Sequence, residues 1–213
     1  MKKFVLLFVV LFFSAGVTFG QFAFGIKVGY NASKLNTSLD SIKSSFNSGF
    51  HFGAFFRIGI GKTVYLQPEA YYTLQGGLFE NNAANTVNNW KQKVTVGSLD
   101  IPVLVGFKLI NLKVVNWRIM AGPMVSFVVN SKIKDVNLTG PITSSDLTKL
   151  NWYVQVGTGV DVLFLTLDIR YQVGLNQMIK TAQLVDANGN ATGQAYSLNA
   201  KNNMWVVSLG FKL

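Results

Sequence analysis

The residues of this chain that could do chemistry are charged side chains set into apolar segments. Each segment has apolar residues at every second position, and ten charged residues lie on the row between them. Seven of the ten are candidates for a shared site: Arg57, Glu69, Asp100, Arg118, Asp161, Asp168 and Arg170. Guanidinium and carboxylate groups form strong charge-assisted hydrogen bonds, and charges kept away from water persist only when they are paired. We therefore predict that the seven residues form one buried polar network. Arg57 and Glu69 stand at similar distances from a shared turn, which predicts a direct contact between them. A path for protons or small ions along the same side chains is the alternative.

The single histidine, His51, indicates a second kind of chemistry. A histidine beside a serine can activate the hydroxyl as a nucleophile when a third group orients the ring. Serines are frequent in residues 32–48, so a lipid hydrolase at the extracellular rim is an alternative function. No spacing in the sequence fixes the serine or the third group. We expect His51 to be a polar interior side chain without a catalytic role.

No other pattern points to a catalytic, metal or cofactor site, and no cofactor is expected. The sequence has no glycine-rich phosphate loop, no paired catalytic carboxylates and no cluster of metal ligands. Asp186, Asn188 and Asn190 are spaced like calcium ligands, but the later glycine and glutamate of a calcium loop are missing. The Asn188-Gly189 pair instead predicts the turn of a small two-stranded hairpin.

The first residues predict a cleavable signal peptide over 1–20, followed by one domain over 21–213. Lys2 and Lys3 precede an apolar run from Phe4 to Phe13, which is too short to span a bilayer as a helix. The chain has no cysteine, so no disulfide and no lipid-modified cysteine is available after export. Only 13% of the residues are charged, about half the usual share for a soluble domain. Both features indicate the cell envelope.

A period of two in the apolar residues predicts eight β-strands, over residues 22–31, 50–60, 64–75, 99–109, 115–130, 152–162, 165–175 and 205–213. The connections between them alternate between long and short, as in outer-membrane barrels with extracellular loops and periplasmic turns. The last strand runs to the end of the sequence and would be an open edge unless it paired with the first strand. The sequence therefore predicts an all-β fold, an eight-stranded antiparallel up-and-down transmembrane barrel.

The same alternation also fits a soluble lipocalin-like lipid carrier, which would turn its apolar row inward and its charges outward. Two features favour the membrane. Aromatic residues gather near the predicted strand ends, at Trp117, Phe127, Trp152, Trp205 and Phe211, and the long and short connections are segregated. We therefore expect the apolar row to face lipid and the charged row to fill a lumen only wide enough for side chains.

The predicted long loops are basic, which bears on the partners of the protein. They contain five acidic residues and nine lysines. The lysines are Lys34, Lys43, Lys91, Lys93, Lys132, Lys134, Lys149, Lys180 and Lys201. A basic outer surface favours anionic partners, and we expect outer-membrane lipid and lipopolysaccharide. A nucleic-acid partner is not expected, because the chain is exported and has no binding motif. We expect a monomer.

Four segments carry a resemblance to a known family: LDIPVLVGFK (99–108), AGPMVSF (121–127), VGTGVDVLFLTLDIRY (156–171) and VVSLGFKL (206–213). They resemble the strands of the PorT-like outer-membrane beta-barrel family of Bacteroidetes, over nearly all of residues 21–213. The resemblance implies an eight-stranded, porin-like barrel in the outer membrane. Some relatives are associated with secretion and gliding machinery, so secretion-system components are possible partners. Leu213 departs from the aromatic final residue that is common in such barrels. The expected function is non-enzymatic: membrane integrity, surface binding or accessory service to a secretion system.

Overall fold

A computed structural model describes residues 22–36, 42–44, 47–81, 91–112, 114–135, 148–176, 182–185, 191–196 and 201–213. The predicted signal peptide lies outside the described residues. The structure contains the strands β1 (Phe22–Asn36), β2 (Ile42–Ser44), β3 (Asn47–Ile60), β4 (Val64–Asn81), β5 (Lys91–Asn111), β6 (Val115–Asp135), β7 (Leu150–Val162), β8 (Leu165–Gly174), β9 (Ala182–Val185), β10 (Ala191–Tyr196) and β11 (Lys201–Lys212). Within the described residues, no helix is long and apolar enough to cross a membrane.

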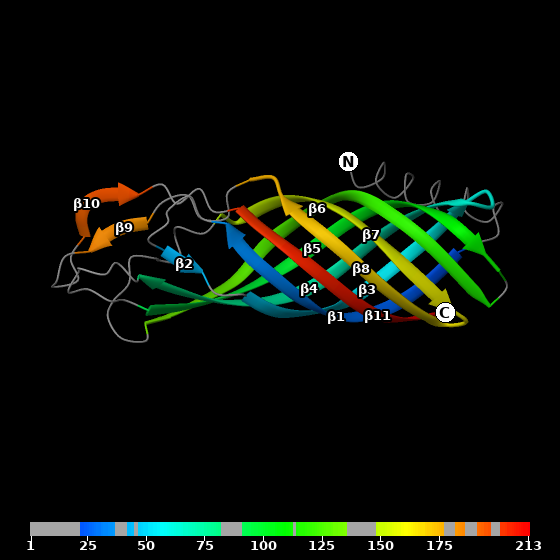
Figure 1. The fold of residues 1–213 in the computed structure, drawn as a ribbon, viewed down its shortest axis with the longest axis horizontal. Helices are drawn as coiled ribbons and strands as arrows, with labels where there is room; N and C mark the ends of the chain where they lie inside the picture. Colours follow the sequence, from blue (N-terminus) through cyan, green and yellow to red (C-terminus); the bar gives the residue numbers. More distant parts are fainter. Residues whose placement is uncertain are drawn as a thin grey trace, which may run out of the picture.

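Eight of these strands form a closed antiparallel barrel, as predicted (Figure 1). Each strand pairs with its neighbour around the barrel, and the β4–β5 pairing completes the circle. The last strand pairs with the first, with Val28 opposite Leu209 and Tyr30 opposite Val207. The seam removes the edge that β11 would otherwise expose. The prediction that the final strand closes on the first is therefore confirmed.

Three tight turns lie at one end of the barrel, which we call the turn end. They join β3 to β4, β5 to β6 and β7 to β8. Gly61 and Leu163 take the left-handed backbone conformation that such turns require, with φ of 70° and 54°. β1 begins and β11 ends at the same end. We call the opposite end, near Asn36 and Asp135, the loop end. Because short turns of outer-membrane barrels face the periplasm, we expect the turn end to face it.

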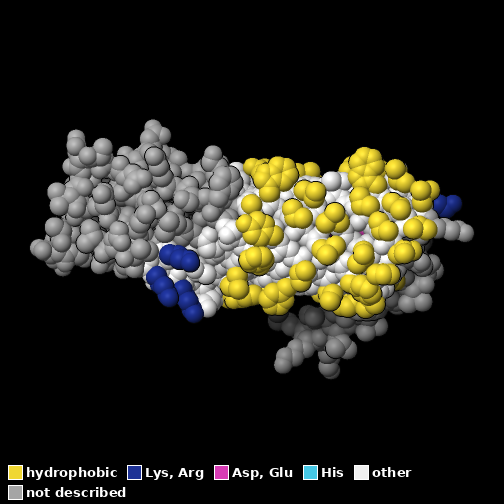
Figure 2. Space-filling view, turned by 60° about the horizontal axis from the view of Figure 1, so that its bottom comes forward, with side chains coloured by type: hydrophobic (Ala, Val, Ile, Leu, Met, Phe, Trp, Pro, Cys, Tyr) yellow, Lys and Arg dark blue, Asp and Glu magenta, His cyan; other side chains and the backbone are white. Residues whose placement is uncertain are grey.

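The apolar row faces outward around the barrel. Large apolar side chains on every barrel strand are exposed, and Figure 2 shows them as a broad band over the barrel wall. The side chains at the alternate positions point into the lumen and are buried, most of them polar or charged. A soluble carrier needs the opposite arrangement, so the lipocalin-like alternative is not favoured.

Several strands are longer at the loop end than the sequence predicts. β1, β4, β5 and β6 continue past the ends of their apolar alternation, and β5 and β6 pair as far as Gln92 and Asp135. Seven lysines that the sequence predicts in loops belong to strands instead: Lys34, Lys43, Lys91, Lys93, Lys132, Lys134 and Lys201. The predicted two-stranded hairpin before the last strand is confirmed, since β9 and β10 pair antiparallel.

Candidate functional site

Six of the seven predicted lumenal residues, together with Lys27, form a buried ion-pair network in the half of the lumen nearer the turn end. Lys27, on β1, lies at its centre. Its ammonium is 2.8 Å from Glu69 Oε1 on β4 and 2.5 Å from Asp168 Oδ2 on β8, and all three side chains are fully buried. Because these strands lie on different sides of the barrel, Lys27 bridges the lumen. The ammonium also lies 4.4 Å from the centre of the Phe55 ring.

Two arginines extend the network along the lumen. Arg118, on β6, pairs with Asp168 and, at 3.0 Å, with Asp161. Arg170, on β8, donates to Glu69 Oε2 at 2.6 Å and to Gln155 Oε1 at 3.2 Å. Each carboxylate of the network therefore pairs with at least two cations, which compensates for its removal from water.

The direct contact predicted between Arg57 and Glu69 is wrong. The register places Glu69 opposite Phe55, two residues from Arg57. Arg57 instead donates from Nε to Gln67 Oε1 at 2.6 Å and from Nη1 to Asp161 Oδ2 at 2.5 Å. The two residues belong to one network but are connected only through others.

Asp100 stands apart from the ion pairs. Its carboxylate accepts hydrogen bonds from the hydroxyls of Thr73 and Ser126, at 2.6 and 2.5 Å. No described cation is paired with it. Neutral hydroxyl groups thus stabilise the buried carboxylate of Asp100. Cations stabilise those of Glu69, Asp161 and Asp168.

The predicted site omits Lys27, although this residue lies on the polar row of the first strand. The signal that could have identified Lys27 was its place on the polar row, which it shares with the seven predicted residues. Which lumenal cations reach the carboxylates depends on geometry across the barrel, and strand alternation does not contain that information.

Gly159, which has no side chain, leaves room for the ion pair between Arg118 and Asp168. A Cβ atom at Gly159, on β7, would lie 2.2 Å from Asp168 Oδ1 and 2.8 Å from the Arg118 guanidinium carbon. Only a residue without a side chain lets the Arg118–Asp168 pair lie against this wall. The small residues on the lumenal row of β7 are therefore part of the site.

His51 lies in a serine–histidine–asparagine arrangement. Its Nδ1 is 2.7 Å from Asn31 Oδ1, and its Nε2 is 2.9 Å from Ser208 Oγ. The serine comes from the last strand, whereas we expected a loop serine. Ser208 is fully buried and also contacts Arg170, 3.3 Å away. A nucleophile needs room for its substrate, so this arrangement, as it stands, is a packed polar contact of the lumen.

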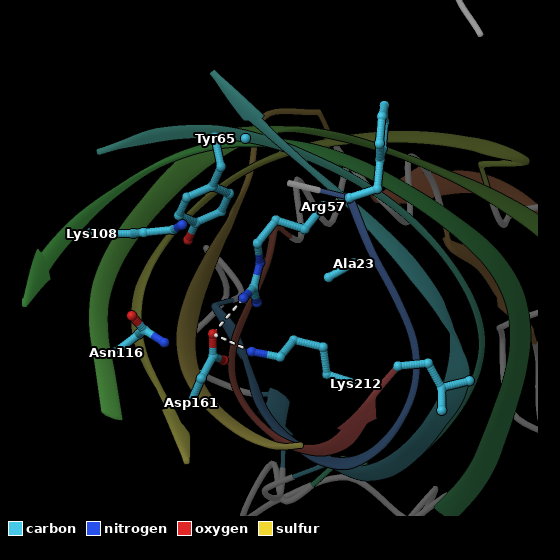
Figure 3. Close-up of a pocket in the computed structure, with 10 residues that line it drawn as sticks. Ala23, Arg57, Tyr65, Lys108, Asn116, Asp161 and Lys212 are labelled. Atoms are coloured by element: carbon cyan, nitrogen blue, oxygen red, sulfur yellow. Dashed lines mark hydrogen bonds and ion pairs between the residues drawn. The ribbon is translucent and has the colours of Figure 1, made fainter. Parts of the chain in front are cut away.

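A cavity of about 340 Å³ lies at the turn end, below the network. Figure 3 shows Arg57 and Lys212 pointing toward Asp161, with Lys108, Tyr65 and Asn116 on the surrounding wall. Lys212 Nζ is 3.6 Å from Asp161 Oδ2. The cavity therefore carries three cationic side chains and one acidic side chain.

Three exposed lysines, Lys93, Lys132 and Lys134, lie on the outer wall at the loop end. Lys93 is directly opposite Lys134, and Lys132 is opposite Thr95. The β5–β6 register shifts where Gly97 pairs with Asn130 and Ser98 with Val128. The extra residue in β6 reverses the alternation, so Lys132 and Lys134 point outward. We call these three residues the lysine row.

The comparisons with known proteins match this architecture. A family model described as an outer membrane protein beta-barrel domain matches residues 13–180. The chain belongs to this family. The outer membrane protein beta-barrel family places it in the outer membrane, as predicted. A comparison with curated proteins finds no match.

Solved structures resemble this family member in fold. OprG from Pseudomonas aeruginosa has a TM-score of 0.51 at 12% identity, covering 90% of this chain and 95% of OprG. Ail of Yersinia pestis has a TM-score of 0.46 at 11% identity, covering 91% of this chain and 99% of Ail. At such low identity the likeness to OprG concerns the fold alone.

Among the residues that the structure describes, no group of three or more acidic or histidine side chains could hold a metal ion.

Proposed function

We propose that the protein is a non-enzymatic outer-membrane barrel that binds the phosphate groups of lipopolysaccharide and so reinforces the outer leaflet. The lysine row carries this proposal. It combines three exposed cations on two paired strands with a position next to the lipid-facing apolar band. Figure 2 shows Lys and Arg side chains gathered at the loop-side border of this band.

The geometry of the lysine row favours a shared anion. Lys93 and Lys134 are directly opposite each other, and like charges at such positions repel. A phosphate group between them would replace that repulsion with charge-assisted hydrogen bonds. The loop end is the end expected to face outward, where the phosphates of lipopolysaccharide lie.

The lumen supports a role that does not depend on transport. The side chains of Lys27, Phe55, Tyr65, Arg118 and Arg170 are among the largest fully buried ones, and they occupy a barrel of only eight strands. Barrels of this size have an interior just wide enough for side chains. We infer that side chains fill the lumen and that the protein binds its partners through the outer wall and the loop end.

Replacing all three lysines of the row with glutamine is expected to weaken lipopolysaccharide binding about a hundredfold. A lysine near an anionic membrane surface contributes about 1 kcal/mol, and three such contributions make about 3 kcal/mol. The measurement is a calorimetric titration of folded protein in detergent micelles with purified lipopolysaccharide. The same lipopolysaccharide without phosphates should bind no better to the wild type than to the triple variant.

A pair of single variants gives a matched control. Lys134→Gln should weaken binding about fivefold, whereas Lys62→Gln, in the exposed β3–β4 turn at the opposite end, should leave it unchanged. Equal affinity of the wild type and the triple variant would show that the lysine row is not the binding site.

The proposal has three further parts: the branch of the family, the oligomeric state and the absence of hydrolase activity. The four segments shared with PorT-like barrels of Bacteroidetes support membership of that branch, and with it an accessory role beside a secretion system. The continuous outward apolar band supports a monomer surrounded by lipid. The burial of Ser208 supports a protein without hydrolase activity.

A further inference from the structure

The cavity at the turn end holds more positive than negative charge. Arg57, Lys108 and Lys212 line it, and Asp161 is the one acidic side chain among its lining residues. Asp161 is itself shared with Arg118, which pairs with it from deeper in the lumen at 3.0 Å. The carboxylate of Asp161 is therefore shared among Arg57, Arg118 and Lys212. Lys108 also stands opposite Arg118 in the β5–β6 register, which adds repulsion between like charges.

Arg57 has hydrogen-bonding capacity left over at this cavity. Its Nε and Nη1 are used by Gln67 and Asp161, whereas its Nη2 is buried and has no hydrogen-bond partner. The residue is only 5% exposed. An unpaired buried N–H of a charged group is costly, so an acceptor that enters the cavity would be favoured. The hydroxyl of Tyr65, also in the lining, is likewise buried without a hydrogen-bond partner and can donate to such an acceptor.

We propose that this cavity binds a phosphate-type oxyanion that enters from the turn end. The guanidinium of Arg57 offers a planar donor, and the ammonium groups of Lys108 and Lys212 offer positive charge on the surrounding wall. The hydroxyl of Tyr65 can donate, and the side-chain amide of Asn116 can turn its NH₂ toward the anion. Guanidinium and ammonium groups together recognise phosphate oxygens well.

The size of the cavity fits this class of ligand. A volume of about 340 Å³ corresponds to roughly ten water molecules at about 30 Å³ each. Inorganic phosphate or a phosphorylated headgroup fits with part of its hydration shell, whereas a sugar oligomer does not. The site is separate from the lysine row, which lies at the other end of the barrel, so either proposal can fail without the other.

Titration calorimetry on the full chain folded in detergent micelles tests this site. Inorganic phosphate should bind saturably at low ionic strength, and sodium chloride at matched ionic strength should not reproduce the heat. Lys108→Gln and Lys212→Gln should each weaken phosphate binding about tenfold or more, as expected for the loss of a hydrogen bond from a charged group. Both lysines are partly exposed, so neither variant removes a buried charge.

A control variant and two further phosphate compounds complete the test of the cavity. Lys62→Gln removes a lysine at the same end but outside the cavity, and should bind phosphate like the wild type. Glycerol phosphate and a short-chain phosphatidic acid in the micelle distinguish the two sources. Binding of the soluble probes indicates a free phosphate compound, and binding of the lipid alone indicates a headgroup. The proposal is overturned if none of the three probes binds, or if both lysine variants bind phosphate as tightly as Lys62→Gln.

Discussion

Asp168→Asn is expected to destabilise the folded barrel by about 3 to 5 kcal/mol, the cost of breaking a buried ion pair on one side. Asp168 is fully buried and pairs with both Lys27 and Arg118. Asparagine keeps the shape but removes the charge, so two buried cations each lose one of their carboxylates. The measurement is reversible denaturant unfolding in lipid vesicles, monitored by tryptophan fluorescence and by heat-modifiable mobility on gels.

Asp100→Asn is the matched control for this prediction. It is the same substitution on the same lumenal row, but Asp100 accepts only from hydroxyl groups in the described structure. The loss should be about 1 kcal/mol, the net value of an ordinary hydrogen bond. Lys27→Met combined with Asp168→Asn should recover part of the loss, because it removes one charge of each sign. Equal destabilisation by the two asparagine variants would show that the ion pairs do not hold the lumen together.

Ile169→Arg is expected to cost about 2 to 4 kcal/mol, because it places a charge on the lipid-facing row at the middle of β8. Ile169 is opposite Val207 of β11, and both side chains point outward. An arginine there must leave water for the hydrocarbon core of the bilayer. Unfolding from phospholipid vesicles measures the effect, since detergent micelles do not fix the depth of the residue.

Leu165→Arg tests whether depth, rather than exposure, sets this cost. Leu165 lies on the same face at the turn end of the same strand, and both residues are 44% exposed. Near the membrane interface the cost of an arginine falls to about 0 to 1 kcal/mol. Similar losses for the two variants would contradict a membrane-spanning orientation of β8.

Sequence alternation was sufficient to predict the barrel, because every spanning strand must separate lipid-facing from lumenal residues at every second position. A charge on the apolar row would be expensive, so the pattern is strict within the membrane. Beyond the apolar band this constraint disappears. The extensions of β4, β5 and β6 at the loop end have no such signal, since backbone pairing with equally long neighbours holds them in place.

The contacts of the lumen depend on register and on the closure of the barrel, which the sequence does not encode locally. The distance of Arg57 and Glu69 from their turn predicted a contact, but Glu69 is opposite Phe55. Lys27 reaches Asp168 across 141 positions of sequence. The bulge in β6 that turns Lys132 and Lys134 outward arises from a register shift against β5. Each of these features follows from tertiary geometry.

The decisive measurement is conductance across a planar lipid bilayer. It tests whether paired charged side chains fill the lumen, so that the protein functions through its outer surfaces and not through transport. Protein whose folding is established by heat-modifiable mobility is added to the bilayer, and the current is recorded under applied voltage. A lumen filled by paired side chains should give no steady conductance above that of the bare membrane. Reproducible, ion-selective steps from the folded wild-type protein would contradict it.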